Sequence, residues 1–534
     1  MPNVLSGHEE FTANERLTLT PYFTNLDSPV FAITNLPEVV KGALFARYSR
    51  SAKSLRRLFL DEFSSDMAAA AVTTSEVGVE RAEKLYTRVF SDYGDDSVAQ
   101  LGGAHIACEG ASNILTKILE RGRLMSYLEQ STRYVPYTDQ SNGRWKYLIP
   151  EEIKDPVLWK HYTETLDAAF ATYAHWLEPM QAHYRKQFPK ATSDSDGVYR
   201  AAIRAKALDT LRGLLPAATQ SNVGIYGSGQ AYEALLLQMR ANPLAEAQQY
   251  AAAMLTELRK VIPAFLTRVD RPDRGERWSK YLAENQSDMQ RLSATVLEQV
   301  KPEPQDEVVL TDYDPDGEIK IVAGALYAVS RLPDDQLLSI ARAMSAEERV
   351  SVLQAYVGNR TNRRHKPGRA FERATYRFDV LSDYGAFRDL QRHRLLTLEW
   401  QNLTPAHGYT EPATIEEVGA LNDWQKVMTT TADLHDTLIT RGLERIASYA
   451  VSMAYRVRFY MQMNAREAMH LIELRSAPQG HPAYRRVSQK MHKLIGEQAG
   501  HQAVAAAMKF ADHSEIDLER LKAERASEKR RQAT

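Results

Sequence analysis

The feature that most constrains the fold of this chain is an internal repeat. Residues 42–46 (GALFA) are matched by residues 324–328 (GALYA) in the second half. A short match gains weight when other features follow it in the same order, because self-similarity at a long period is typical of duplicated folding units. Further matched positions do lie downstream of both segments.

An arginine pair follows each matched segment, at residues 121–123 (RGR) in the first half and 392–394 (RHR) in the second. Each pair precedes an apolar run of helical period that ends in another arginine, Arg240 or Arg475. Because the order of these features is the same in both halves, the sequence predicts two tandem copies of one fold.

A polar passage punctuated by prolines separates the two halves. It runs from Arg271 to Glu307, and its composition suits a linker around one polar helix. The last residues of the chain form a second charged stretch, which predicts a solvated helix that frays into a tail. We therefore expect four regions: an N-terminal repeat at 28–270, a linker at 271–304, a C-terminal repeat at 305–513 and a charged tail at 514–534.

Both halves mix long helical stretches with short apolar runs. Residues 243–265 and 478–510 predict long helices, whereas residues 307–310 and 319–322 alternate in a way that predicts short strands. The fold class expected from this pattern is α+β.

The composition is that of a globular chain and excludes several classes of protein. Of the 534 residues, 44% are hydrophobic and 25% are charged, and the net charge is −1. A nearly neutral chain has no global field for nucleic acid or an anionic membrane, so an anionic ligand must be met by local arginines. The single cysteine, Cys108, excludes an intramolecular disulfide and a cysteine-rich metal site. Without an apolar run long enough to span a membrane or a recognisable signal peptide, the chain is expected to be cytoplasmic and free of membrane contacts.

The strongest local signal is the segment 121–134, which contains three arginines, two serines and a glutamate. Arginine forks bind phosphate through paired charge-assisted hydrogen bonds, and serine hydroxyls add further donors. Glu129 cannot bind phosphate, but it can accept hydrogen bonds from the donors of a ring or a ribose. The residues alone therefore suit a nucleotide site, and they also suit a surface segment of salt bridges.

The spacing of this segment resembles the nucleotide motif of the flavin-dependent thymidylate synthases, with Gly122 where the family has histidine. A second match is residues 209–216 (DTLRGLLP), which resembles the Arg-x-x-Leu-Pro segment of the family. Arg240 resembles the arginine placed near the reacting uracil. By this resemblance the substrate-binding residues of the first half are Arg121, Arg123, Glu129, Ser131, Arg133 and Arg212.

The second half resembles the same family in a complementary way. Its arginine pair is intact, but Trp400 and Asn402 stand where the family has glutamate and serine. Residues 464–466 (NAR) resemble the flavin-contact segment, which the first half lacks because Ala231 stands at the position of the arginine. By this resemblance the flavin-binding residues are Arg392, His393, Arg394, Asn464, Arg466 and, by a looser match, His365.

The resemblance implies an enzyme that methylates dUMP to dTMP. Methylenetetrahydrofolate would supply the carbon, reduced FAD the hydride, and NADPH would reduce the flavin. Arg240 and Arg475 would act at the reacting ring, with Arg475 open to either ligand. The fold implied is two tandem repeats of the family fold, a mixed sheet with long helices. The family's shared active sites imply a homodimer that forms a pseudo-tetramer.

Two other functions remain open at this point. The missing histidine at Gly122 and the replacements at Trp400 and Asn402 favour a non-catalytic paralogue that binds flavin or a nucleotide. A flavin- and folate-dependent enzyme that acts on another pyrimidine is the second alternative. No metal site is expected, because His470 and His481 have no carboxylate or cysteine at ligand spacing.

Overall fold

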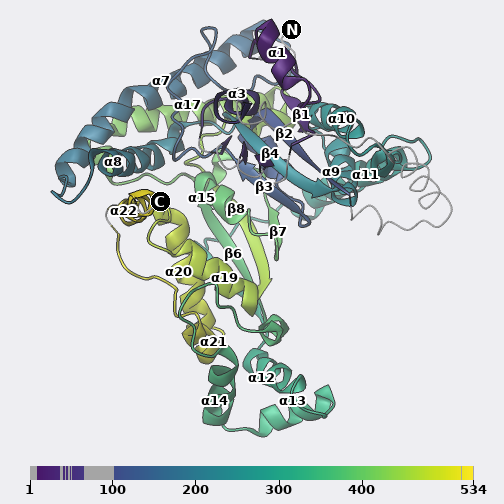
Figure 1. Ribbon diagram of the computed structural model, residues 1–534, viewed down its shortest axis with the longest axis vertical. Coiled ribbons are helices and arrows are strands. Elements are labelled where there is room, and N and C mark those ends of the chain that lie inside the picture. Colours follow the sequence, from purple (N-terminus) through teal and green to yellow (C-terminus); the bar gives the residue numbers. More distant parts are fainter. Residues whose placement is uncertain are drawn as a thin grey trace. The chain divides into compact units, whose positions relative to one another are not determined.

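The structure is a computed structural model that describes residues 9–36, 40–41, 44–45, 48–49, 51–64, 102–516, 518 and 520–532 (Figure 1). The chain forms two compact units. Unit 1 consists of Met1–Ala174, Leu215–Lys301 and Gln425–Ser452. Unit 2 consists of His175–Leu214, Pro302–Trp424 and Met453–Thr534.

Neither unit is made from one half of the sequence alone. Residues 175–214 come from the first half but belong to unit 2, and residues 425–452 come from the second half but belong to unit 1. The helices α7 (Pro156–Gln187) and α17 (Leu421–Thr440) each carry the chain from one unit into the other. The two halves therefore exchange corresponding helical segments, and the predicted sequence boundaries do not coincide with the compact units.

Each unit contains one sheet of four strands, and the two sheets have the same topology. The strand order is β1-β2-β4-β3 in unit 1 and β5-β6-β8-β7 in unit 2. This match confirms the prediction of two α+β repeats. The described strand pairings are all antiparallel, so the expectation of a mixed sheet is corrected. The strands are β1 (Val30–Ile33), β2 (Gly103–Ser112), β3 (Met125–Glu129), β4 (Gln220–Ser228), β5 (Val308–Tyr313), β6 (Thr375–Asp383), β7 (Thr397–Trp400) and β8 (Arg456–Asn464).

The two central strands of each sheet lead directly into helices, and a polar residue makes each transition. Ser112 starts α6 (Asn113–Leu119) and Ser228 starts α9 (Gly229–Ala241) by accepting a hydrogen bond from the first turn. Asp383 and Asn464 do the same for α15 (Tyr384–Leu390) and α19 (Ala465–Arg475). Short polar side chains at this position satisfy backbone donors that the helix leaves unpaired. The four helices therefore begin at matched positions in the two units.

Unit 1 packs helix α10 (Ala245–Arg259) against β1 and β2. The buried core includes Ile106 and Ile225 of the sheet together with Tyr250 and Met254 of α10. Leu434, from the exchanged helix α17, belongs to the same core. The remaining elements of unit 1 are α1 (Ala13–Leu19), α3 (Leu55–Glu62), η3 (Pro263–Leu266), α11 (Gly275–Val296), α18 (Glu444–Ala447) and η6 (Ser448–Ala450).

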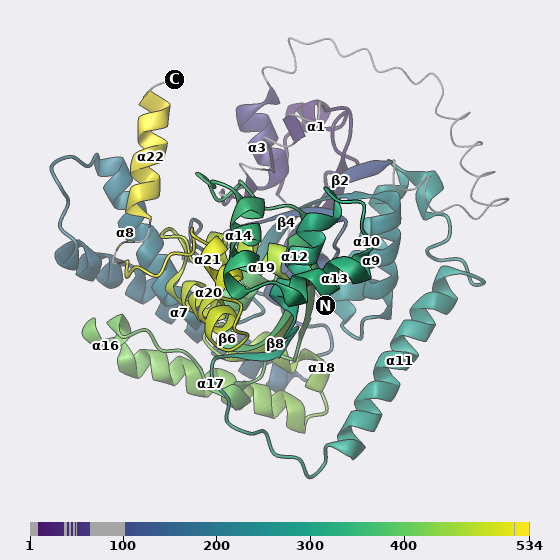
Figure 2. The same cartoon turned by 90° about the horizontal axis from the view of Figure 1, so that it is seen from below.

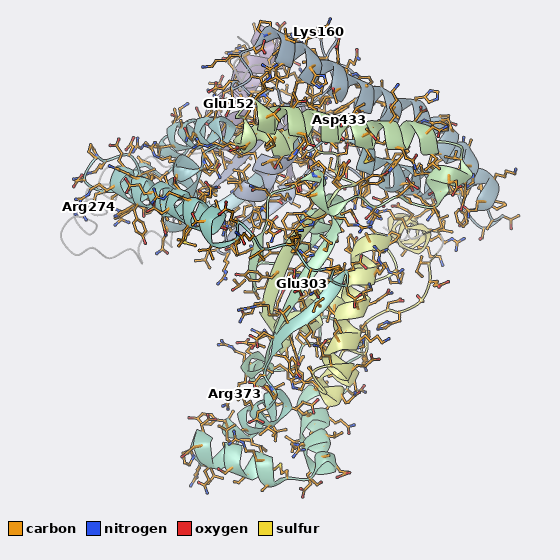
Figure 3. All side chains as sticks on the ribbon, turned by 180° about the vertical axis from the view of Figure 1, so that it is seen from behind. Glu152, Lys160, Arg274, Glu303, Arg373 and Asp433 are labelled. Carbon is orange, nitrogen blue, oxygen red and sulfur yellow. The ribbon has the colours of Figure 1, made fainter. Side chains whose placement is uncertain are left out.

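Unit 2 places α20 (Pro482–Glu497) against β5 and β6, in the position that α10 takes in unit 1 (Figure 1). At one end of this unit, Arg373 donates hydrogen bonds of 2.5 and 2.8 Å to Asp334 (Figure 3 labels Arg373). The remaining elements of unit 2 are α8 (Asp196–Leu211), η2 (Arg212–Leu214), α12 (Gly317–Tyr327), α13 (Asp334–Ala343), α14 (Ala346–Val357), η4 (Arg369–Arg373), η5 (Pro405–His407), α16 (Thr414–Glu417), α21 (Gln502–Ala507) and α22 (Leu521–Gln532).

The polar passage and the C-terminal stretch both contain helices. The 22-residue helix α11 occupies most of the passage that we expect to be a linker (Figure 2). The C-terminal helix α22 contacts α8 in unit 2, where Arg525 donates hydrogen bonds of 2.5 and 2.8 Å to Asp194. The charged stretch is therefore tied to a helix of its own unit.

The run 319–322, expected as a strand, lies inside helix α12. Its apolar residues continue into Ala323 and Ala325, which are also buried, so the run is part of a longer buried helical face. A short apolar run cannot distinguish a strand from a buried helix by periodicity alone. Within the described ranges, no helix combines the length and the apolar character needed to cross a bilayer.

Candidate functional site

Three arginines surround one aspartate in unit 2. Asp389, in the last turn of α15, lies 3.7 Å from Arg475 and 3.9 Å from Arg392. Its other oxygen lies 3.8 Å from Arg212, which η2 brings from the first half of the sequence. Arg212 also lies 3.8 Å from Asp209, so the three guanidinium groups share two carboxylates at these distances and outnumber them. Asp389 and the three arginines, called the arginine cluster below, are therefore suited to an anionic ligand.

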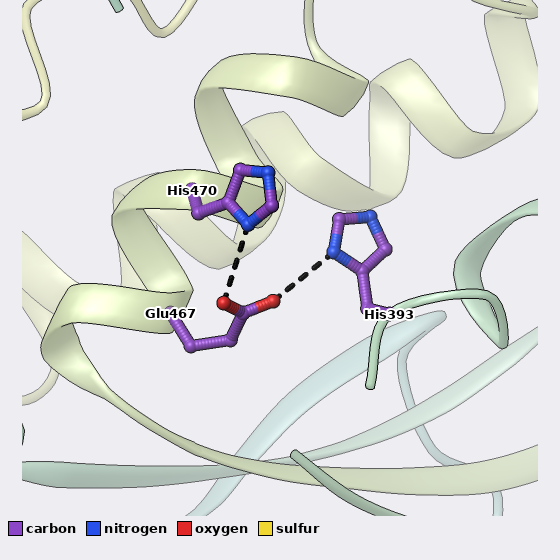
Figure 4. Close-up of side chains that lie close together, drawn as sticks. All are labelled: His393, Glu467 and His470. Atoms are coloured by element: carbon purple, nitrogen blue, oxygen red, sulfur yellow. Dashed lines mark hydrogen bonds and ion pairs between the residues drawn. The ribbon is translucent and has the colours of Figure 1, made fainter. Parts of the chain in front are cut away.

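A hydrogen-bonded chain extends from the arginine cluster through His393. Arg475 Nε donates to His393 Nε2 over 3.0 Å, so Nε2 is an acceptor and the proton of the neutral ring lies on Nδ1. His393 Nδ1 donates to Glu467 over 3.1 Å, and the second oxygen of Glu467 lies 3.2 Å from His470 Nδ1 (Figure 4). The chain holds the Arg475 side chain in one orientation.

Burial decides the protonation of this chain. It lowers the pKa of His393 to about 4, and the nearby Arg475 charge acts in the same direction, so the ring is neutral at pH 7. Burial alone would raise the pKa of Glu467, but hydrogen bonds from His393 and His470 outweigh it and bring that pKa to about 2. Glu467 is therefore ionised throughout the physiological range.

His393, Glu467 and His470 also have the atom types of a metal site, with possible ligand atoms within 4.8 Å of one another. The expectation that no carboxylate lies at ligand spacing from His470 is therefore wrong. Glu467 lies three residues before it, on the same face of α19. The hydrogen-bond directions favour a different role. His393 uses Nε2 to accept from Arg475 and Nδ1 to donate to Glu467, so neither nitrogen offers a lone pair to a metal in this arrangement.

The other residues expected to bind flavin lie around the ends of α19 and α15. Asn464 caps α19, and its side chain accepts a hydrogen bond of 2.9 Å from the Glu467 backbone. Arg466 donates to the Pro367 carbonyl over 3.0 Å, while His365 and Arg394 are exposed. The segment that carries His365 is held by Arg360, which forms a buried bidentate pair with Glu473 at 2.7 and 2.6 Å.

The caps also correct one sequence match. Because Asn464 and Ser228 cap corresponding helices, Arg466 corresponds to Gln230 and not to Ala231. The two helices differ by one residue between the cap and the arginine that ends each apolar run, and counting back from Arg240 therefore shifts the match by one position. The segment 94–97, the first-half counterpart of the His365 segment, lies outside the described residues.

Six of the residues expected to bind or act on the nucleotide are in unit 1. Arg121 and Arg123 are exposed, and Ser131 accepts a hydrogen bond of 3.3 Å from the Arg133 backbone. Glu129 is fully buried and lies 3.1 Å from Lys117, which also pairs with Glu120. Arg240 is half-buried, and its Nε has no hydrogen-bond partner among the described residues. Arg212 therefore belongs to unit 2, with the second-half site residues, whereas Glu129 belongs to unit 1.

Unit 1 has a different arrangement at the position that matches Arg212. The 3₁₀ helices η2 and η6 each end a helical segment before the last strand of a sheet, so Arg212 corresponds to Ser448 and Gly213 to Tyr449. Tyr449 donates a hydrogen bond of 2.7 Å to Glu246, which also accepts bonds of 2.8 and 2.7 Å from Ser112. Burial raises the pKa of Glu246 to about 7.

Sequence reasoning missed Asp389 and Glu467, although each had a local signal. Asp389 precedes Arg392 by three residues and Glu467 precedes His470 by three, which is the spacing of neighbours on one helical face. It also missed Lys117, whose burial could not be inferred from a charged residue in an ordinary helical run.

Comparison with known proteins identifies the family. The family described as thymidylate synthase complementing protein matches residues 44–264 and 309–499, one segment in each half. The chain belongs to this family of flavin-dependent thymidylate synthases.

Individual members of the flavin-dependent thymidylate synthase family differ in how much of the chain they match. A UPF0159 protein of Chlamydia muridarum is 38% identical over 532 residues, which cover 98% of this chain and 99% of the relative. The flavin-dependent thymidylate synthase of Mycobacterium tuberculosis is 31% identical over 182 residues, which cover 34% of this chain and 66% of that protein. A solved UMP/dUMP methylase from Streptomyces cacaoi matches 38% of this chain and 96% of its own, with 16% identity and a TM-score of 0.30.

Proposed function

We propose that this chain methylates C5 of dUMP to form dTMP, with methylenetetrahydrofolate as carbon donor, reduced FAD as hydride source and NADPH as reductant of the flavin. The observation that supports this most is the arginine cluster of unit 2, in a chain from a flavin-dependent family. The cluster combines Arg212, expected to bind the nucleotide, with Arg392 and Arg475 beside the expected flavin residues.

The charges of the cluster suit both ligands. Reduced flavin carries negative charge near N1, FAD carries a pyrophosphate, and dUMP carries a phosphate. Arg392, His393, Arg394, Asn464, Arg466 and His365 are the residues proposed to hold FAD, and the flavin would supply the hydride when bound. We propose that the nucleotide is bound by Arg121, Arg123, Glu129, Ser131, Arg133 and Arg212. Arg240 and Arg475 are proposed to act at the reacting ring. Among these residues, Glu129 would have to move most to reach a nucleotide, because its side chain is buried and paired with Lys117.

The reaction balances without a protein nucleophile. The methylene carbon of the folate is bonded to two nitrogens. A bond forms between C5 of the pyrimidine and this carbon as the first carbon–nitrogen bond breaks, the second breaks as the C5 proton leaves, and the two nitrogens take up protons. One hydride then completes the methyl group, and tetrahydrofolate is released. Arg475 would stabilise negative charge on the ring oxygens while the C5 bond forms, and the neutral His393 keeps it oriented. Cys108 is fully buried in unit 1, and burial raises the pKa of its thiol, so it suits no role as a nucleophile.

The test is release of tritium from dUMP labelled at C5, in the presence of methylenetetrahydrofolate, NADPH and FAD. We expect release by the wild-type protein and a loss of at least about a hundredfold in Arg475→Ala, which removes a donor aimed at developing charge. Arg342→Ala is the matched control, because Arg342 forms a half-exposed pair with Asp316 in the same unit and should leave the rate unchanged.

Flavin stoichiometry is measured on the same preparation by absorbance. We expect one flavin per chain, because Gly122 stands at the unit 1 position of His393 and Ile118 at that of Asp389. Flavin binding without tritium release, and without rescue of a thymidine-requiring strain, would contradict the proposed reaction and favour the non-catalytic paralogue. Tritium release from a different labelled pyrimidine, and none from dUMP, would favour the other alternative.

A further inference from the structure

A cavity of about 350 Å³ lies beside the start of α15 in unit 2. Its lining includes Arg212, Asp383 and Trp424, with Tyr184 and His481 among the other residues. The volume is at the lower end of the range for small-molecule sites, which limits an occupant to about one heterocyclic ring and a small substituent.

Three polar atoms of this lining are buried without a hydrogen-bond partner in the described part of the chain: Arg212 Nη2, Asp383 Oδ2 and Trp424 Nε1. The three residues are 4%, 7% and 1% exposed. Buried polar atoms in proteins nearly always have partners, and each exception needs an explanation. Three exceptions in the wall of one cavity indicate that a ligand supplies the missing partners.

The local structure explains why these atoms are left over. Asp383 Oδ1 accepts the capping bond of 2.9 Å from the Ala386 backbone, which leaves Oδ2 without a partner within the described ranges. Arg212 Nη1 lies 3.8 Å from both Asp389 and Asp209, which leaves Nη2 without a partner in the described part of the chain. Gly385 permits this arrangement, because a Cβ at that residue would lie 3.0 Å from Arg212 Nη2 and 3.0 Å from Asp383 Oδ1. The two side chains are therefore close neighbours.

The unpaired atoms define the chemistry of the occupant. Arg212 Nη2 and Trp424 Nε1 can only donate. Burial raises the pKa of Asp383, while the Arg212 charge and the Ala386 backbone hydrogen bond oppose this and favour the carboxylate, which can only accept. A cyclic imide, in which one ring N–H lies between two carbonyl groups, offers the matching set of one donor and two acceptors. A cytosine ring does not match, because its ring nitrogen accepts and its amino group donates.

We propose that this cavity binds the edge of a cyclic imide ring, with Asp383 accepting from the ring N–H and with Arg212 and Trp424 donating to the carbonyl oxygens. The three atoms are shielded from bulk water, so the ring reaches them by small displacements of the cavity wall, and the shielding strengthens the bonds that form. Unit 1 offers no such set at the matching cap, because Ser112, Glu246 and Tyr449 satisfy one another.

Two ligands of the proposed reaction contain this edge, the uracil ring of dUMP and the pyrimidinedione ring of the flavin. The identification of the ring with either ligand rests on the proposed function, whereas the imide pocket itself does not. Binding is therefore measured apart from turnover, by titration calorimetry of the full chain with dUMP, dCMP and FMN in the absence of folate.

Asp383→Asn is the most selective variant, because asparagine is an equally good helix cap but presents an amide donor where Asp383 has an acceptor. We expect the wild type to bind dUMP at least tenfold more tightly than dCMP. The variant should lose at least about tenfold in dUMP affinity and lose the preference over dCMP. Asp335→Asn, at an exposed position in the first turn of α13, is the control and should change neither.

Trp424→Phe keeps an aromatic ring in the wall and removes only the indole N–H, so a loss of several-fold in dUMP affinity is expected. Trp278→Phe, at a partly exposed tryptophan of α11, should have no effect. If FMN and not dUMP shows the dependence on Asp383, the pocket still binds an imide and its source is the flavin. Equal affinity of the wild type for dUMP and dCMP, or unchanged binding of both dUMP and FMN in a folded Asp383→Asn protein, would overturn the proposal. Imide binding that depends on Asp383, in a protein without tritium release, would support the pocket and contradict only the proposed reaction.

Discussion

The two units differ at one matched position, where a capping residue joins a central strand to the helix that follows it. In unit 2, Asp383 caps α15, and the neighbouring Arg212 keeps a guanidinium nitrogen that has no partner among the described residues. In unit 1, Ser112 caps α6, and the neighbouring Tyr449 and Glu246 close the position with hydrogen bonds of 2.7 Å. The sheets, the caps and the exchanged 3₁₀ helices match, so the difference comes from a few side chains.

This comparison shows how a duplicated fold can divide its tasks. Buried atoms without partners reduce the stability of unit 2 and persist where a ligand uses them. At the matched position of unit 1, Ser112, Glu246 and Tyr449 satisfy one another and stabilise the fold. The same contrast holds at the arginine pairs, where His393 orients Arg475 in unit 2 while Gly122 stands at the matching position in unit 1.

The largest expected effect of a single substitution is at Lys117. It tests whether the buried charges of unit 1 stabilise the fold or bind a ligand. Lys117→Ala would leave Glu120 and Glu129 as buried carboxylates without their cation, which should cost about 3–5 kcal/mol of unfolding free energy. The measurement is urea unfolding followed by circular dichroism. Lys160→Ala, in an exposed pair with Glu164, should change the stability by less than about 0.5 kcal/mol. A stable Lys117→Ala protein that loses dUMP binding would instead give this group a role at the ligand.

An effect of similar size is expected from pH in unit 2. The pKa of His393 falls from its ordinary value of 6.5 to about 4 on folding, so the unfolded chain takes up the proton first as the pH decreases. The associated stability is complete above pH 6.5 and is lost as the pH falls toward 4, by about 3 kcal/mol in total. Protonation also places an N–H opposite Arg475 Nε, so ligand affinity should fall in the same range.

The measurement for this prediction is the urea midpoint at pH 7 and at pH 4.5. His393→Asn serves as the matched variant, because it keeps a donor toward Glu467 and does not titrate. The difference between wild type and variant should shrink with decreasing pH. An equal pH response in both proteins would show that His393 does not carry the effect.

The smallest effect is expected at Tyr449, which closes the unit 1 position. Tyr449→Phe removes the hydroxyl that donates to Glu246 and should cost about 1–2 kcal/mol of unfolding free energy. Binding of dUMP and flavin should stay within twofold of the wild type, because neither Tyr449 nor Glu246 is among the residues proposed to bind these ligands. A loss of ligand affinity without a loss of stability would break the division of tasks between the units.

The sequence predicted the arginines and the histidine of the candidate site, but it did not predict the acidic residues beside them. Residues 392–394 and Arg475 are matched by spacing along the chain, and the structure does bring Arg392, His393 and Arg475 together. Asp389, Glu467 and Asp383 were not singled out, because acidic residues are usually solvated. Only packing shows that Glu467 and Asp383 are buried and that Asp389 lies among arginines. The helical state of residues 319–322 was missed because a short apolar run fits both periods.

The amino-acid sequence by itself determined that the chain contains two α+β repeats of one family, because repeated motifs and their order are local properties that can be counted along the chain. The tertiary structure decided which repeat supplies each part of a site. Residues 175–214 and 425–452 pack in the unit built around the other repeat's sheet, and this exchange brings Arg212 to Asp389 and Tyr449 to Glu246. Such a choice depends on the burial of apolar faces between segments far apart in sequence, and no local pattern records it.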